Sequence, residues 1–233
     1  GGLVIARSVA DLEAARAAGT PAAILAIENA DVTEKSLYVL QTLHALGVRA
    51  IGLTHNVSSC AADGCLEARP GVGLTAFGVA MVREMNRLGM VVDLAHVSPG
   101  AFSHALEVVE KPVLFSHGNA RALCDHFRNL TDDQLRALRD NGGVIGLSYV
   151  PDFVDAMRPT VERLLDHVDH IVGVAGIETV GLGSDFDGGG TLLRDATETW
   201  QIVEGLLDRG YGEADVRALL GGNMLRVLQA AMG

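Results

Sequence analysis

Short apolar segments alternate with longer amphipathic segments along almost the whole chain of 233 residues. The apolar segments are rich in Val, Ile and Leu, and runs this short are typical of strands that are buried on both faces, as in parallel sheets. We therefore predict strands at residues 21–28, 49–55, 90–96, 112–117, 143–150 and 179–187.

Amphipathic segments fill the intervals between these strands. They predict helices at residues 9–18, 33–46, 75–88, 101–109, 131–141 and 161–174, and two more at 197–209 and 213–229 after the last strand. Strands that alternate with helices imply βαβ units and a parallel sheet. The length suits one domain and no linker interrupts the pattern, so we predict a single α/β domain over residues 1–233.

The charge balance excludes two classes of partner. The chain carries 18 basic and 29 acidic side chains, a net charge of −11, whereas nucleic acids and anionic lipids require a basic surface. The longest charge-free runs, residues 36–48 and 70–82, are shorter than the ~20 apolar residues of a membrane helix. Three cysteines, an odd and small number, indicate reduced thiols, so we expect a cytoplasmic protein.

Five of the predicted strands end in a polar residue that can bind a metal ion or transfer a proton. These residues are Glu28, His55, His96, His117 and Asp185. The carboxyl ends of parallel strands share one edge of the sheet, which is the active-site face of a barrel and the binding crevice of an open sheet. We therefore predict that these residues form one site.

Glu28, His96 and His117 are the candidate metal ligands. Imidazole nitrogens and a carboxylate oxygen suit Zn²⁺ and similar ions, and three ligands leave a position for water. Such an ion lowers the pKa of bound water from ~15.7 towards ~7. The alternative for each histidine is a hydrogen-bonded place in the core, but the position of both at strand ends favours ligation.

Three further residues have open alternatives. His55 could be a ligand, a proton shuttle, a donor to a developing oxyanion, or a core histidine. Asp185 could carry a proton from water to a leaving amine, or be a solvated acid in a glycine-rich turn. Arg128 could bind a substrate carboxylate through two hydrogen bonds, although a surface arginine is the more ordinary interpretation.

His167 and His170 lie at helical spacing in the segment LLDHVDHI. An aspartate precedes each of them. This pattern is typical of a solvated helix face, so we assign neither residue to the site.

Several long segments resemble the membrane (renal) dipeptidase family of zinc metallopeptidases, over nearly the whole chain. They are IENAD (27–31), GVRAIGLTHN (47–56), GLTAFGVAMVREMNRLGMVVDLAHVS (73–98), PVLFSH (112–117), RNLTDDQL (128–135), VGLGSDFDG (180–188) and GNMLRVL (222–228). The resemblance implies a (β/α)8 barrel of the TIM type, a homodimer and hydrolysis of dipeptides by metal-activated water. It also implies tolerance of D-residues at the C-terminal position of the dipeptide.

The resemblance implies a role for each candidate residue. Glu28 resembles the glutamate that bridges two zinc ions, and His96 and His117 resemble the histidines of the second zinc. His55 resembles the histidine that contacts substrate near the scissile carbonyl. Asp185 resembles the residue that passes a proton to the leaving amine, and Arg128 the one that binds the substrate's C-terminal carboxylate.

Two departures from the family pattern affect these expectations. The family's IEGG reads IENA here, which alters the loop after Glu28. The family's first strand ends in His-x-Asp, which completes the first zinc site, but no His-x-Asp precedes Glu28 in this sequence. The predicted strands number about six of the eight that a barrel needs, so we expect a barrel incomplete at its N-terminus. It would hold one or two Zn²⁺ ions, because the second zinc site has few ligands.

The first functional hypothesis is therefore a metal-dependent dipeptide hydrolase. A second hypothesis is a catalytically impaired family remnant that binds small carboxylated ligands or a partner subunit. A third is a related metal hydrolase that acts on another amide or ester, because the altered loop after Glu28 changes the substrate pocket.

Overall fold

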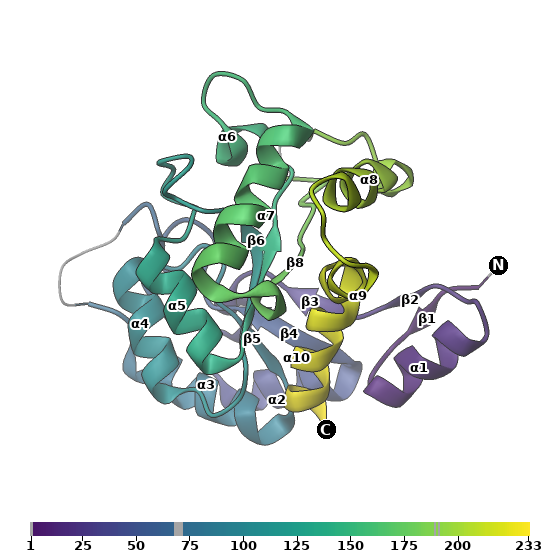
Figure 1. The fold of residues 1–233 in the computed structure, drawn as a ribbon. Coiled ribbons are helices and arrows are strands. Elements are labelled where there is room, and N and C mark those ends of the chain that lie inside the picture. The colour runs from purple at the N-terminus through teal and green to yellow at the C-terminus, as the bar shows by residue number, and fades with distance from the viewer. Residues whose placement is uncertain (1, 68–71, 189, 191) are drawn as a thin grey trace. The chain divides into compact units, whose positions relative to one another are not determined.

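The computed structural model describes residues 2–67, 72–188, 190 and 192–233 (Figure 1). The chain divides into two compact units. The first comprises Gly1–Leu114 with Leu225–Gly233, and the second comprises Phe115–Met224. Both units combine parallel strands with helices, as the alternating sequence pattern predicts.

The first unit contains a parallel sheet in the order β3-β4-β5, to which the first residue of β6 is added. Ile27 pairs with Ile51, and Ile51 pairs in turn with Val92, so the three strands are in close register. Helix α2 contacts β4 and helix α3 contacts β5, which buries the apolar face of each helix. The bounds of these elements are β3 Leu25–Ile27, α2 Leu37–Leu46, β4 Val48–Gly52, α3 Ala76–Leu88, β5 Val91–Asp93, α4 Pro99–Val108, β6 Leu114–Gly118 and, from Leu225 onward, α10 Asn223–Met232.

A small second sheet precedes β3. Strand β1 (Val4–Ile5) and strand β2 (Ala22–Ala23) pair in parallel, and helix α1 (Val9–Ala17) connects them. The predicted strand at residues 21–28 is therefore two strands, because β2 pairs with β1 while β3 pairs with β4. Strand β1 is absent from the predictions because two apolar residues give no periodic pattern.

The second unit contains strands β6, β7 and β8, which follow one another in the sheet. Val180 of β8 pairs with Ile145 of β7 in parallel register. Helix α7 packs against both α5 and α8. The bounds are α5 Asp132–Asn141, β7 Val144–Leu147, α6 Pro151–Val154, α7 Val161–Ala175, β8 Val180–Leu182, α8 Trp200–Asp208 and α9 Glu213–Arg217, and short 3₁₀ helices are found at Ala30–Thr33, Ile177–Thr179 and Ala196–Glu198.

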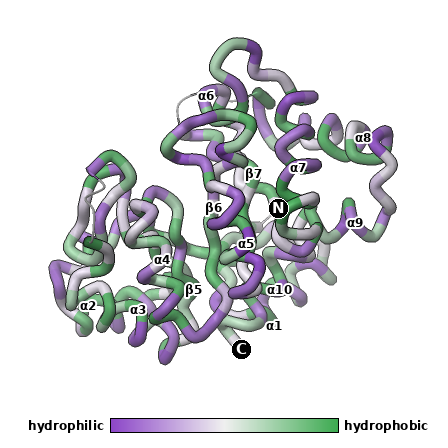
Figure 2. Tube along the Cα trace, turned by 60° about the vertical axis from the view of Figure 1, so that its left-hand side comes forward, coloured by the Kyte–Doolittle hydropathy of each residue, from purple (hydrophilic) through white to green (hydrophobic). Residues whose placement is uncertain are grey.

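Side-chain caps determine where the longer helices begin and end. Thr75 accepts a hydrogen bond from the Gly78 amide at the start of α3, and Gly89 ends that helix with a φ of 71°. Helices α2 and α5 likewise begin after a serine or threonine and end at a glycine with positive φ. In Figure 2, hydrophobic and hydrophilic residues alternate along helices such as α2 and α3, as expected for helices with one buried face.

The prediction of an α/β fold with six parallel strands is confirmed in the described residues. These strands are β3 to β5 in the first unit and β6 to β8 in the second. The predicted helix at 213–229 is interrupted, since α9 ends at Arg217 and a π-helical turn, Ala218–Gly222, precedes α10. The glycine pair at 221 and 222 explains the interruption, because glycine is a poor helix former. No helix in the described part of the chain is long and apolar enough to cross a membrane.

The prediction of a solvated face for His167 is wrong. Its side chain is fully buried in the second unit. Nδ1 of His167 accepts a hydrogen bond from the Ala120 amide at 3.1 Å, and Nε2 donates to the Val154 carbonyl at 2.8 Å. A neutral imidazole satisfies both partners, and burial lowers the pKa of His167.

This burial predicts a pH-dependent stability. As the pH falls below ~6.5, His167 takes up a proton in the unfolded chain before it does so in the folded chain, so the free energy of unfolding should fall. We expect His167→Gln to be less stable than the wild type by ~1–3 kcal/mol at pH 7.5, because a buried hydrogen bond is lost. Between pH 7.5 and 5.5, the free energy of unfolding of His167→Gln, measured by urea unfolding, should fall less than that of the wild type. An unchanged pH dependence would contradict this assignment.

Candidate metal centre

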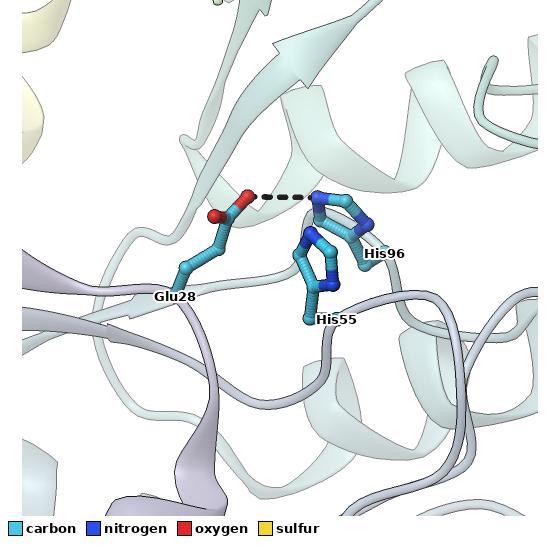
Figure 3. Close-up of side chains that lie close together, drawn as sticks. All are labelled: Glu28, His55 and His96. Carbon is cyan, nitrogen blue, oxygen red and sulfur yellow. Dashed lines mark hydrogen bonds and ion pairs between the residues drawn. The ribbon is translucent and has the colours of Figure 1, made fainter. Parts of the chain in front are cut away.

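Glu28, His55 and His96 lie together in the first unit (Figure 3). One potential ligand atom from each residue lies within 4.8 Å of those of the other two. Oε1 of Glu28 is 2.9 Å from Nε2 of His96, and the rings of His55 and His96 are tilted with their centroids 4.5 Å apart. The Glu28 side chain is 53% exposed, whereas that of His96 is only 4% exposed.

The parallel strands bring these residues together from distant parts of the sequence. Glu28 directly follows β3, while His55 and His96 each lie three residues beyond the ends of β4 and β5. The strands are thus shorter than predicted, and the histidines belong to the loops that follow them. The carboxyl ends of three adjacent strands share one edge, which explains the cluster.

Gly52, the last residue of β4, allows the backbone of Glu28 to come close. A Cβ atom at this position would lie 2.8 Å from the carbonyl oxygen of Glu28, which is closer than real Cβ contacts. Any side chain at residue 52 would therefore push β4 away from Glu28.

The backbone of His96 adopts a left-handed conformation, with φ at 67°. This conformation is uncommon for a residue other than glycine and costs roughly 1–2 kcal/mol. A hydrogen bond of 2.8 Å from the Cys65 amide to the His96 carbonyl helps to hold it. Backbone strain of this kind concentrates at functional sites, where the surrounding structure fixes it.

His117, Asp185 and Arg128 lie in the second unit. His117 is part of β6, and its Nε2 is 3.9 Å from Oδ2 of Asp185, which follows β8. The Arg128 guanidinium donates a hydrogen bond to the His117 carbonyl at 3.3 Å and lies 5.2 Å from the centre of the Phe153 ring. Only 5% of Arg128 is exposed, so the interpretation of Arg128 as a surface arginine is wrong.

Two glycines permit the close packing around His117 and Asp185. A Cβ atom at Gly146 of β7 or at Gly183 after β8 would lie far inside contact distance of the Ser116 carbonyl oxygen. The absence of both side chains brings the backbones of these strands close to the residue that precedes His117. Asp185 itself has a left-handed φ of 60°.

The structure thus gathers part of the predicted ligand set and extends it. Glu28 and His96 lie together, as predicted, and His55 joins them as a third potential ligand. His117 is placed beside Asp185 in the other unit. One further residue, Asn56, was missed at the sequence level although it directly follows His55: its Oδ1 lies 2.8 Å from Nδ1 of His96.

The donor set fits a divalent metal ion. One carboxylate and two imidazoles within 4.8 Å of one another are ligands that Zn²⁺ prefers. The hydrogen bond between Nδ1 of His96 and Asn56 leaves Nε2 directed at Glu28, and such outer hydrogen bonds are typical of metal-binding histidines.

Comparison with known proteins identifies the family. Residues 2–232 match the family described as membrane dipeptidase, peptidase family M19. The chain belongs to the membrane dipeptidase family. An uncharacterized dipeptidase of Schizosaccharomyces pombe is 41% identical over 219 residues, covering 90% of this chain and 53% of that protein. The dipeptidase verJ of Clonostachys rogersoniana is 36% identical, covering 98% of this chain and 60% of the relative.

The chain spans about half the length of the curated members of the membrane dipeptidase family that it matches. Among solved structures, a metallo peptidase from Rhodobacter sphaeroides superposes with a TM-score of 0.92 at 29% identity, covering 98% of this chain and 69% of that one. That protein was crystallised with a phosphinate mimic of the dipeptide L-Ala-D-Ala. The likeness to structures of the family confirms the expected TIM-barrel-type α/β fold class.

The close approach at Gly52 yields a prediction. Gly52→Ala should lower the free energy of unfolding by ~1–3 kcal/mol, because its methyl group forces β4 and Glu28 apart. It should also weaken Zn²⁺ binding, measured by competition with a chromophoric chelator, because Glu28 is displaced relative to His96.

Gly173→Ala is the matched control. A Cβ atom at Gly173, in helix α7, meets no atom within 4 Å. This substitution should raise stability by ~0.5–1 kcal/mol through better helix propensity and leave Zn²⁺ affinity unchanged. Wild-type stability and affinity in Gly52→Ala would contradict the role given to Gly52.

Proposed function

We propose that this chain is the metal-binding part of a dipeptidase that hydrolyses dipeptides with a metal-activated water molecule. The observation that carries the proposal is the cluster of Glu28, His55 and His96 in a member of the membrane dipeptidase family. The chain spans about half the length of its curated relatives, and we infer dipeptidase activity for the whole protein from this cluster and the family match.

We assign metal binding to Glu28, His96 and His117, with Zn²⁺ as the ion. When bound, such an ion lowers the pKa of a water molecule and polarises a carbonyl oxygen. The chain's contribution is to present ligands: the Glu28 carboxylate and Nε2 of His96 already face each other at 2.9 Å. His117 has its Nδ1 occupied at 2.8 Å by Ser116 Oγ, so its Nε2 is the nitrogen that would bind.

The remaining residues act on the substrate. His55 is exposed and lies against the ring of His96, so it is suited to contact the scissile carbonyl. Asp185 would accept a proton from water and deliver it to the leaving amine, a role suited to a carboxylate. Arg128 would bind the C-terminal carboxylate, and because Arg128 is buried, water competes little for this ion pair.

We propose dipeptides as substrates, including those with a D-residue at the C-terminal position. The Rhodobacter sphaeroides structure with its L-Ala-D-Ala mimic supports this choice. We also propose that residues 1–233 belong to one dipeptidase-like barrel domain, that the protein forms a homodimer and that it is cytoplasmic. The match over residues 2–232 supports the first, and three free cysteines support the last.

The hydrolytic proposal predicts separate defects for two carboxylates. The wild type, supplied with Zn²⁺, should hydrolyse L-Ala-D-Ala. The reaction is followed by detection of free alanine. Glu28→Gln should lose metal binding and activity together, because Glu28 is a ligand. Asp185→Asn should keep its metal but lose about 10²–10⁴-fold in kcat, because proton transfer fails.

Asp187→Asn is the control, since Asp187 is an exposed carboxylate two residues from Asp185. It should retain wild-type turnover. Binding of Zn²⁺ and of the dipeptide without turnover by the wild type would reject the hydrolytic proposal.

The role of Arg128 yields a second prediction. Arg128→Lys keeps the charge but cannot form two parallel hydrogen bonds, so KM for L-Ala-D-Ala should rise ~10–100-fold, equivalent to a lost charge-assisted hydrogen bond. A dipeptide with a C-terminal amide lacks the carboxylate, so its KM values for the wild type and the variant should differ far less. An equal effect on both substrates would show that Arg128 does not bind the carboxylate.

A further inference from the structure

We propose that Asn56 is a positioning residue that sets which nitrogen of His96 faces the metal site. The inference rests on the proposed function in one respect, namely that His96 is a metal ligand. The hydrogen bonds around Asn56 carry the inference.

The contact with Asn56 determines that Nδ1 of His96 carries a proton. Oδ1 of Asn56 is a carbonyl oxygen and can only accept a hydrogen bond, so Nδ1 of His96 must carry the proton of their 2.8 Å contact. A ring nitrogen that carries a proton cannot bind a metal ion. Oε1 of Glu28, 2.9 Å from Nε2, also only accepts, so Nε2 can carry a proton as well in the metal-free chain, and this is the proton that a metal ion bound at Nε2 would displace.

The oxygen of Asn56 is itself held in place. The Cys65 thiol donates to Oδ1 at 3.6 Å, and the Leu66 amide donates to the backbone carbonyl of Asn56 at 2.9 Å. Asn56 has a left-handed φ of 61°, a conformation that asparagine and aspartate adopt more readily than most residues.

The same short segment also fixes the backbone of His96. The Cys65 amide donates to the His96 carbonyl at 2.8 Å, and Gly64 forms a bridge with Val97. A Cβ atom at Gly64 would overlap the Asn56 carbonyl oxygen, so only glycine allows this approach. Residues 64–66 thus hold Asn56 and His96 together, and the hydrogen bond between their side chains needs no rearrangement before a metal binds.

Two substitutions at residue 56 separate the acceptor oxygen from the backbone conformation. Asn56→Gly removes the oxygen and tolerates the positive φ, whereas Asn56→Asp keeps an acceptor and also tolerates it. Lys35→Gly is the matched control. Lys35 also has a left-handed φ, of 58°, and among the described hydrogen bonds none joins it to Glu28, His55 or His96.

Zn²⁺ affinity is the first measurement, by competition with a chromophoric chelator. We expect Asn56→Gly to bind Zn²⁺ about 10–100-fold more weakly than the wild type, as for other lost outer hydrogen bonds to ligating histidines. Asn56→Asp should remain within a few-fold of the wild type, and Lys35→Gly should be unchanged. Equal Zn²⁺ affinity in the wild type and Asn56→Gly would overturn the proposal.

The second measurement is whether Nδ1 of His96 carries a proton in the metal-free chain, read from the ring ¹⁵N chemical shifts at pH 8. We expect a protonated Nδ1 in the wild type and in Asn56→Asp, and loss of this preference in Asn56→Gly. An Nδ1 without a proton in the wild type would overturn the proposal even if Asn56→Gly failed to fold. If the wild type bound no Zn²⁺, the proposed function would fail, while the proton on Nδ1 would still test Asn56.

Discussion

The hydrogen-bonded register of three short parallel strands is the constraint on which the metal centre depends. Ile27, Ile51 and Val92 lie side by side in β3, β4 and β5, so the residues that follow these strands emerge at one edge. Glu28 and His96 are 68 positions apart in the sequence, yet their side chains are 2.9 Å apart. Each strand has only three to five residues, so small shifts in pairing would separate these two side chains.

Left-handed backbone recurs where chemistry is expected. Asn56, His96 and Asp185 all have positive φ, although none is glycine. In His96 the surrounding loop supplies compensating hydrogen bonds, notably from Cys65. Glycines perform the complementary task, because Gly52 and Gly183 let neighbouring backbones come closer than a side chain would permit. In each unit, the candidate functional residues therefore combine a strained backbone with close packing next to them.

The α/β class, the six main strands and most helices could be predicted from the sequence. Apolar runs and amphipathic segments reveal these elements because they reflect which side chains the fold buries. It also indicated Glu28 and His96, since polar residues at the ends of apolar runs stand out. The chemical roles came from the family resemblance rather than from periodicity. The contact between Nδ1 of His96 and Asn56 could not be predicted, because it joins residues 40 positions apart and follows no repeating pattern.

His167 shows the converse difficulty. Its neighbours Asp166 and Asp169 suggest a solvated helix, but the helix turns His167 inward to a backbone amide and a carbonyl. Charged neighbours one or two positions away on a helix point in other directions, so they say little about a residue's own surroundings. Only the partners at Ala120 and Val154 distinguish a buried structural histidine from a solvated one.

The unequal exposure of the two facing candidate ligands, Glu28 and His96, has a kinetic consequence. The carboxylate of Glu28 is open to solvent while the imidazole of His96 is enclosed. An incoming cation would meet the exposed carboxylate, whose charge attracts it, before it reaches the enclosed ring. Loading and release would then follow an ordered route, and a chelator that competes from outside would act on the carboxylate-bound stage.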